Sequence, residues 1–167
     1  MQYPIRRLFR TSASIRLLVA VAGVAASAPA ACAGDLCFGA TAYPVGEAPS
    51  DVLLADFNND GTLDLVVANH DVKLDNRVSL LLNNGDGTFG PTEFHDVGAR
   101  PYWLTSADFN NDGWTDLAVT NYFGSSFSIL FNIGGTFAPQ VEVSCQSGPT
   151  FLAAGDVDQD GWSDLVV

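Results

Sequence analysis

The chain has few basic residues, and most of them stand near its start. Among 167 residues there are 7 Lys or Arg and 19 Asp or Glu. All 19 acidic residues lie after Ala33, where only Lys73, Arg77 and Arg100 are basic, so the formal charge of segment 34–167 is 3 minus 19, or −16. Because binding to phosphates requires a basic surface, this composition argues against a nucleic acid partner.

Residues that carry chemistry are also scarce. There are 3 cysteines and 2 histidines, and the chain contains no glycine loop for phosphates, no zinc-ligand spacing and no hydrolase nucleophile motif. His70 and His95 have no Ser or Cys nucleophile in a recognisable motif beside them, so we expect ordinary exposed or hydrogen-bonded side chains. Nothing in these residues predicts catalysis, and we expect a protein that is not an enzyme.

A long hydrophobic run is missing too. The most apolar stretch extends from Leu17 to Ala26. It has about ten residues, whereas a helix needs about twenty to cross a bilayer. We therefore predict no transmembrane span.

The same stretch fits a secretory signal peptide. A basic segment precedes it, and the small-residue triplets Ala28-Pro29-Ala30 and Ala31-Cys32-Ala33 follow it, as at a signal cleavage site. The basic residues are Arg6, Arg7, Arg10 and Arg16. We predict a signal peptide over residues 1–33, cleaved after Ala30 or Ala33, and secretion to an extracellular or periplasmic space. Lipidation of Cys32 stays open, although Pro29 replaces the aliphatic residue expected three positions before a lipidated cysteine.

One acidic loop is abundant in this chain. It occurs three times, as DFNNDGTLD over 56–64, DFNNDGWTD over 108–116 and DVDQDGWSD over 156–164. Each copy reads D-x-[D/N]-x-D-G-x-x-D, with oxygen-bearing side chains at positions 1, 3, 5 and 9 and glycine at position 6. This is the ligand spacing of a calcium loop.

Charge explains why such a loop requires a cation. Ten of the 19 acidic residues lie in the three loops. Two carboxylates about 4 Å apart repel by roughly 4 kcal/mol at an effective dielectric constant near 20, so several together are unfavourable without a metal. Calcium accepts six to eight oxygens in flexible geometry, whereas magnesium prefers a strict octahedron. We predict about two to three bound Ca²⁺ ions, with Gly61, Gly113 and Gly161 at the sharp turn.

The residues after each loop predict strands. Position 12 is Val67, Val119 or Val167, where a helix-loop-helix calcium site has a bidentate Glu. The segments LDLVVAN, TDLAVTN and SDLVV are short, apolar and rich in valine, without a helical period. We therefore expect each loop to join one buried strand to another.

A longer repeat surrounds the loops. Their first residues are spaced by 52 and 48 positions, and a proline stands seven residues before each one. One repeat holds about four strands: one before the loop, one after it, and two around a Gly/Asn turn. The third strand is expected to end at Asn83 or Asn132, and the fourth to begin at Phe89 or Phe137. A period near 50 with four strands is typical of a propeller blade, so we predict an all-β fold.

These motifs together resemble the FG-GAP repeat, also called the VCBS repeat, of integrin alpha-chain heads and many bacterial secreted proteins. The resemblance rests on Thr-Phe-Gly, on Val-Gly followed by Pro, on the Ala-Asp-Phe-Asn-Asn-Asp-Gly-x-x-Asp loop and on the Leu-x-Val exit, and it extends from Phe38 onward. It implies a seven-bladed β-propeller with calcium in the loops between adjacent strands. Residues 34–167 would form two complete blades and part of a third.

The resemblance also implies the ligands of each ion. Positions 1, 3, 5 and 9 would bind through side chains, and position 7 only through its backbone carbonyl. The first site would comprise Asp56, Asn58, Asp60, Thr62 and Asp64, the second Asp108, Asn110, Asp112, Trp114 and Asp116, and the third Asp156, Asp158, Asp160, Trp162 and Asp164.

The third repeat stops at Val167, inside its second strand. Propellers typically close with four to eight blades. We expect that the chain is the front part of a longer protein; the alternatives are assembly with other copies and an open wedge.

Two further features stay open. Cys37 and Cys145 would meet an oxidising compartment, so a disulfide between them is allowed, as is a partner in sequence beyond this chain. Trp103, Trp114 and Trp162 are expected to pack over adjacent blades, the alternative being a sugar-binding face.

Two classes of function fit these observations. The first is a secreted calcium-binding module for adhesion or binding, which meets an extracellular protein or carbohydrate ligand and uses calcium structurally. The second is a scaffold or substrate-docking domain of a larger secreted enzyme or toxin. We favour the first, because nothing present can carry a reaction.

Overall fold

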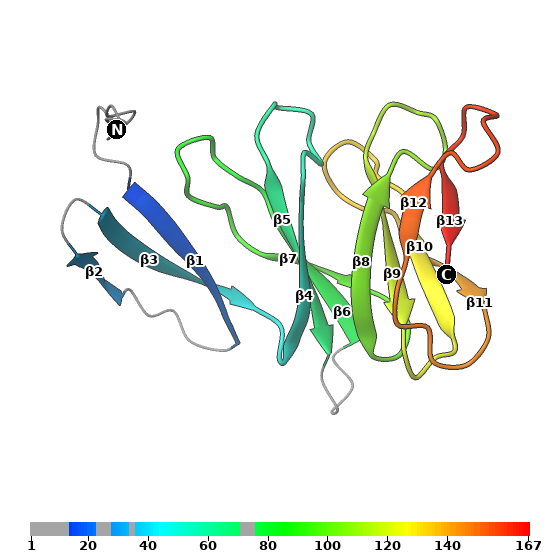
Figure 1. Ribbon diagram of the computed structural model, residues 1–167, viewed down its shortest axis with the longest axis horizontal. Helices are drawn as coiled ribbons and strands as arrows, with labels where there is room; N and C mark the ends of the chain where they lie inside the picture. Colours follow the sequence, from blue (N-terminus) through cyan, green and yellow to red (C-terminus); the bar gives the residue numbers. More distant parts are fainter. Residues whose placement is uncertain (1–13, 23–27, 34–35, 71–75) are drawn as a thin grey trace, which may run out of the picture. The chain divides into compact units, whose positions relative to one another are not determined.

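The computed structural model describes residues 14–22, 28–33, 36–70 and 76–167 (Figure 1). This described part is all-β, and none of it forms a helix that is long and apolar enough to cross a membrane. The chain divides into two compact units, Met1–Pro44 and Val45–Val167.

The first unit contains a three-stranded sheet. Its strands are β1 (Ser14–Ala22), β2 (Ala28–Ala33) and β3 (Leu36–Val45), in the order β1-β3-β2. β2 runs antiparallel to β3, and Cys32 is the register partner of Cys37. The predicted signal peptide lies in this unit, with residues 1–13 and 23–27 outside the described ones. Its cleavage is a matter of processing and remains a prediction.

The second unit contains two four-stranded antiparallel sheets. The first is β4 (Pro49–Ala55), β5 (Asp64–His70), β6 (Asn76–Leu81) and β7 (Glu93–Asp96), in that order. The second is β8 (Pro101–Ala107), β9 (Asp116–Asn121), β10 (Ser126–Leu130) and β11 (Val141–Ser144). We call them the first and second blades. β12 (Ala153–Gly155) and β13 (Asp164–Val166) pair as the start of a third.

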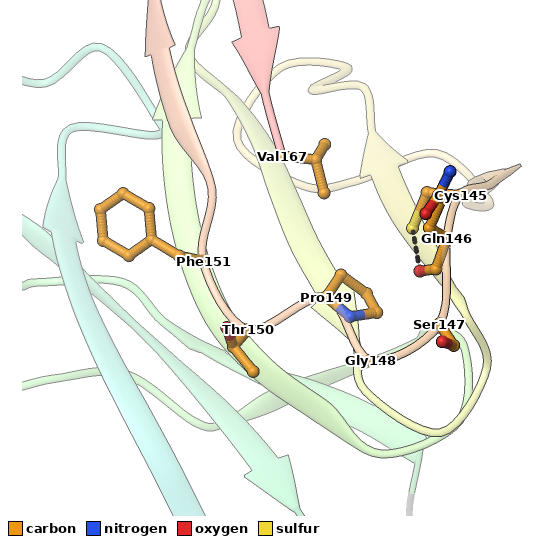
Figure 2. Close-up of a pocket in the computed structure, with 8 residues that line it drawn as sticks. All are labelled: Cys145, Gln146, Ser147, Gly148, Pro149, Thr150, Phe151 and Val167. Carbon is orange, nitrogen blue, oxygen red and sulfur yellow. Dashed lines mark hydrogen bonds between the residues drawn. The ribbon is translucent and has the colours of Figure 1, made fainter.

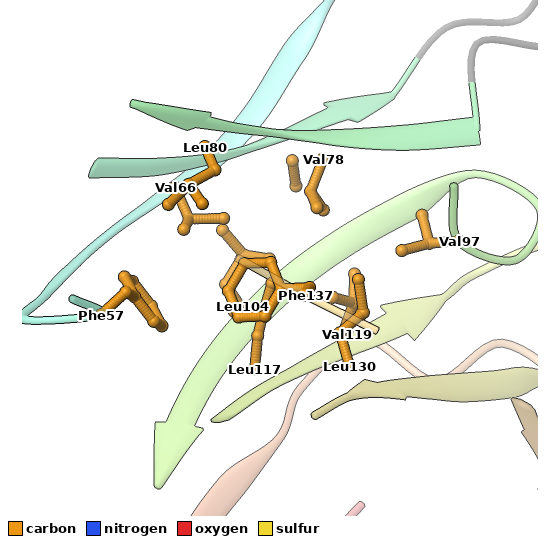
Figure 3. Close-up of a cluster of buried hydrophobic side chains, with 11 residues drawn as sticks. Phe57, Val66, Val78, Leu80, Val97, Leu104, Leu117, Val119, Leu130 and Phe137 are labelled. Atoms are coloured by element: carbon orange, nitrogen blue, oxygen red, sulfur yellow. The ribbon is translucent and has the colours of Figure 1, made fainter. Parts of the chain in front are cut away.

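The two blades pack on one another through a hydrophobic core (Figure 3). From β5, Val66 and Ala68 enter this core, and β9 contributes Leu117 and Val119. Both strands are buried along nearly their whole length, because each is covered on both faces. That explains their near-continuous apolar sequences. Each buried Val or Leu contributes about 1.5–3 kcal/mol relative to exposure.

The strand boundaries confirm most of the predicted blade. β4 and β8 end directly before their acidic loops, and β5 and β9 begin at the last loop residue. The fourth strands begin later than predicted, at Glu93 and Val141. Phe89 and Phe137 instead form isolated bridges to Asn83 and Asn132, which close the preceding turns.

The cause of this later start is local. Pro91 and Pro139 follow the bridges by two residues. A proline has no N–H to donate to a strand ladder, so pairing stops there and resumes beyond it.

Candidate metal centres

Each acidic loop connects the first strand of a repeat to the second. The connections β4–β5, β8–β9 and β12–β13 lie at the same end of the second unit, at the top in Figure 1. The three candidate centres are therefore neighbours, although about 50 residues separate them in sequence.

The side chains of each loop fold back over its own amides. In the first loop, Asp56 accepts hydrogen bonds from the backbone N–H groups of Asp60 (3.2 Å) and Gly61 (2.9 Å). Asn58 Oδ1 accepts a second bond from Asp60 N at 3.1 Å, and Asp60 Oδ1 accepts one from Thr62 N at 2.8 Å. The same four bonds recur in the second and third loops. The three loops thus share one geometry.

The glycine at position 6 is required by the backbone. Gly61, Gly113 and Gly161 have φ angles of 84°, 87° and 90°. A Cβ at any of them would meet nothing within 4 Å, so the constraint is conformational and not a lack of space. The predicted sharp turn is confirmed at all three positions.

In the first two loops, the aspartate at position 9 differs from the other loop aspartates in being buried. Asp64 and Asp116 have no exposed surface. Asp116 Oδ2 accepts a hydrogen bond from Phe109 N at 2.9 Å, and its Oδ1 accepts one from Asn132 N at 2.8 Å. Asp64 accepts equivalent bonds from Phe57 N and Asn83 N, and Asp164 accepts one from Val157 N at 2.8 Å. In the first and second loops, this residue therefore joins the loop to the segment that directly follows the third strand.

Burial leaves the charge of this group only partly compensated. It raises the pKa of Asp116, while the hydrogen bonds from Asn132 and Phe109 lower it, and the nearby Asp112 and Asp108 carboxylates raise it further. In the first loop, by contrast, hydrogen bonds from Thr62 and Asn58 lower the pKa of the exposed Asp60. A cation among these groups would remove the repulsion that acts on Asp116.

Three carboxylates of the third loop come close enough together that they could share one cation. Carboxylate oxygens of Asp156, Asp158 and Asp164 lie within 4.8 Å of one another. Two oxygens on opposite sides of one Ca²⁺, each at 2.3–2.6 Å, are about 4.6–5.2 Å apart. At position 3, the first and second loops have Asn58 and Asn110 where the third loop has an aspartate. An amide carbonyl is also a ligand that calcium accepts. The residues present therefore fit the ion.

Position 7 takes part through its backbone N–H. Thr62, Trp114 and Trp162 each donate this group to the aspartate at position 5, at 2.8 Å. Thr62 Oγ1 adds a bond of 2.6 Å to the same Asp60 oxygen. That their carbonyls bind a metal remains a prediction.

A family model described as FG-GAP-like repeat matches residues 56–119 and again residues 108–167. The matches begin at the first aspartate of the first and second loops, and together they cover more than half of the 167 residues. The chain belongs to the FG-GAP-like repeat family. These repeats are non-catalytic modules, and their match agrees with the propeller-type blades described above. No curated protein and no solved structure matches the chain.

Successive FG-GAP-like repeats are also linked through their loops, which sequence reasoning missed. Asn59 Nδ2 donates to the carbonyl of Gly113 at 3.2 Å, and Asn111 Nδ2 donates to that of Gly161 at 3.5 Å. Asn59 and Asn111 have φ angles of 57° and 55°, which asparagine tolerates better than most residues. In the sequence, the asparagine at position 4 of the first and second loops is the feature that could have indicated this link.

The histidines play no part in these centres. His70 accepts a hydrogen bond from Arg100 Nε, as expected of a hydrogen-bonded side chain. His95 is different, because its ring packs edge-on against Phe137 at 5.1 Å and its Nε2 has no hydrogen-bond partner. In its strand β7, Glu93, Phe94 and Asp96 are exposed, and only His95 is partly buried.

The cysteine and tryptophan predictions have mixed outcomes. Cys145 is free, and its pairing with Cys37, which lies in the other unit, stays an open prediction. Its thiol lies 3.4 Å from the carbonyl of Gln146, in a cavity of about 420 Å³ formed by residues 145–151 and Val167 (Figure 2). Trp103 packs against Phe151 of the third repeat, with ring centroids 4.8 Å apart, as predicted for packing over an adjacent blade. Trp162 is 50% exposed and does not follow that prediction.

Proposed function

We propose that the chain is a secreted, calcium-stabilised propeller-type module that binds an extracellular protein or carbohydrate ligand, with calcium in a structural role. One observation carries the calcium part. The same loop geometry occurs three times, and in the third loop three carboxylates bring oxygens within 4.8 Å of one another. Because the position-9 aspartate ties the first and second loops to the segment that follows the third strand, an ion held by either loop would stabilise the blade itself.

The binding part of the proposal rests on what the repeats offer. The FG-GAP-like repeat is a non-catalytic module. Blades present loops at both ends of their strands, and such loops are where binding residues are usually placed on a rigid scaffold. The acidic loops occupy one end, which leaves the other end for a ligand.

Thermal unfolding tests the calcium part. At ten times the dissociation constant, each ion adds about 1.4 kcal/mol to the free energy of unfolding. We expect the midpoint to rise with calcium relative to EGTA, and to rise less with magnesium. Equal midpoints in calcium and EGTA would contradict the proposal.

Two variants sharpen this test. Asp60→Ala removes an oxygen ligand from the first loop, so it should reduce the calcium-dependent part of the stability by about one site. Asp158→Asn is the matched control, since it gives the third loop the residue that the other loops already have at position 3. It should leave the number of bound ions unchanged.

Export is tested separately. The mature protein should begin at Ala31 or Gly34, because cleavage is expected after Ala30 or Ala33. Amino-terminal sequencing of protein recovered from outside the cytoplasm would read either start. Protein that retains residues 1–33 in the cytoplasm would refute secretion and leave calcium binding intact.

A further inference from the structure

An aromatic cluster lies at the end of the blades that is opposite the acidic loops. It comprises Tyr102, Tyr122 and Phe123, with His70 and Arg100. Tyr102 stands at the start of β8, Tyr122 directly follows β9, and His70 ends β5. These are the strand ends farthest from the loops, because each loop joins the end of β4 or β8 to the start of β5 or β9.

The rings form a continuous series. The centroids of His70 and Tyr102 are 5.6 Å apart, those of Tyr102 and Tyr122 5.9 Å, and those of Tyr122 and Phe123 5.5 Å. The guanidinium of Arg100 lies over the Phe123 ring at 4.1 Å and over the Tyr122 ring at 5.9 Å. The cluster therefore combines apolar faces with a positive charge.

These side chains remain open to solvent. Tyr102 is 39% exposed, Tyr122 37% and Phe123 64%. Exposed aromatic rings beside an arginine have the composition of binding hot spots, because they give large contact area for little conformational entropy.

Two residues of the cluster differ from the residues at the same positions of the other repeats. Tyr102 corresponds to Ser50 in the first repeat and to Thr150 in the third, at the loop spacings of 52 and 48 residues. Arg100 corresponds in the same way to Ala48 and Gly148. The residues Arg100, Ala48 and Gly148 all have positive φ angles, of 63°, 47° and 71° respectively. The turn is therefore common to the three repeats, while the arginine is particular to the second.

The charge of Arg100 indicates which chemical group a partner would place beside the rings. Segment 34–167 carries a formal charge of −16, and Arg100 is one of its three basic residues. In the part of the chain that the structure describes, no ion pair joins Arg100 to a carboxylate. A partner group with one carboxylate next to an apolar side chain would match both the guanidinium and the rings.

We propose that the aromatic cluster binds a protein partner through a segment that places an apolar side chain beside a carboxylate. This rests on the proposed binding function and names its site. A protein is favoured over a small ligand, because small ligands are enclosed by concave sites. Two cavities of the second unit are lined by residues outside the aromatic cluster. One is the cavity of residues 145–151, and the other, of about 310 Å³, lies between β7 and the segment 137–140.

The test selects peptides from a displayed random library on the calcium-loaded chain. Selected peptides should combine an aromatic or large aliphatic residue with Asp or Glu. Synthetic copies should bind Arg100→Gly and Tyr102→Ser about tenfold more weakly or worse, as expected for hot-spot residues. Both substitutions copy residues that other repeats have at those positions, and Gly suits the positive φ at position 100.

Phe94→Ser is the matched control. Phe94 is 44% exposed and has Arg77 over its ring at 4.6 Å, but it lies on β7, outside the cluster. Binding to this variant should equal binding to the wild type. The calcium-dependent melting midpoint of every variant verifies folding.

Three results would overturn the inference. The first is that no peptide is selected, and the second is that the selected peptides bind Arg100→Gly and Tyr102→Ser as well as they bind the wild type. The third is that no peptide binds, while the wild type binds to a glycan array and these two variants do not. The last would identify a saccharide site. In each case a retained calcium effect on melting leaves the calcium part of the proposed function standing, so the two failures are distinguishable.

Discussion

The side chain of Asn132 donates a hydrogen bond of 2.7 Å to the backbone carbonyl of Phe57, across the boundary between the two blades. The same amide donates to the carbonyl of Thr115 at 2.9 Å, and the backbone N–H of Asn132 donates to Asp116 at 2.8 Å. One buried residue therefore connects the first acidic loop to the second.

Replacing this side chain should destabilise the module. Asn132→Ala leaves the buried carbonyl of Phe57 and the part-buried carbonyl of Thr115 without this donor, which should cost about 2–4 kcal/mol. Denaturation by urea measures the loss. Asn83→Ala is the control, because Asn83 makes its bond to the carbonyl of Leu63 in an exposed setting. Equal losses in the two variants would show that the link between blades contributes little.

The close contact of Gly98 with Asn121 predicts a second effect. A Cβ at Gly98 would lie 2.2 Å from Nδ2 of Asn121, whose amide donates to Ser126 and Ser128. Gly98→Ala should therefore destabilise the second blade by about 1–3 kcal/mol through overpacking. Gly155→Ala, where a Cβ meets nothing within 4 Å, should change stability little. A tolerated Gly98→Ala would mean that Asn121 moves without cost.

Charge count should rank the three centres. The third loop has four aspartates and the other two have three each, and calcium affinity in such loops rises with ligand charge. We expect Asn58→Asp to tighten calcium binding by the first loop and to lower stability in EGTA, where the added repulsion is uncompensated. Calorimetry and melting measure the two effects. An added aspartate that changes neither would argue against a cation in the loop.

His95 predicts a dependence of stability on pH. Burial lowers its pKa below the ordinary value of about 6.5, although Glu93 and Asp96 act in the opposite direction. Above pH 6.5 the residue is neutral in both states. As the pH falls below that value, the unfolded state takes up the proton first, so stability is lost as the pH falls toward the native pKa.

The loss should not exceed about 1.4 kcal/mol per pH unit for one group. Urea midpoints between pH 7.5 and 5.5 in saturating calcium measure it, and His95→Gln should flatten the curve. Because the pKa of His70 is lowered too, by burial and then by Arg100, His70→Asn measures its separate share. A wild-type midpoint that rises on acidification would reverse the assigned direction.

The parts of the fold that depend on local sequence were predictable. The regular spacing of Asp56, Asp108 and Asp156 predicted the blades, because a repeat can be read directly from the sequence. The glycines at position 6 predicted the turns, because a turn depends on residues that are neighbours in the chain. The start of β7 was predicted too early, at Phe89, since the effect of Pro91 on the ladder was overlooked.

The contacts between repeats could not be predicted in the same way. The bond from Asn132 to Phe57 joins residues 75 positions apart, and Tyr102 meets Tyr122 only because β8 pairs with β9. The burial of Asp116 likewise follows from the third strand of its blade. Such features depend on which surfaces pack together, and a single acidic motif does not encode that.

Calorimetric titration of calcium into the chelator-treated chain is the decisive measurement of calcium binding by the loops. We expect saturable binding of one ion per loop, with Asp60→Ala losing one of them and the midpoint of unfolding rising as the sites fill. The absence of saturable binding in folded protein would contradict it.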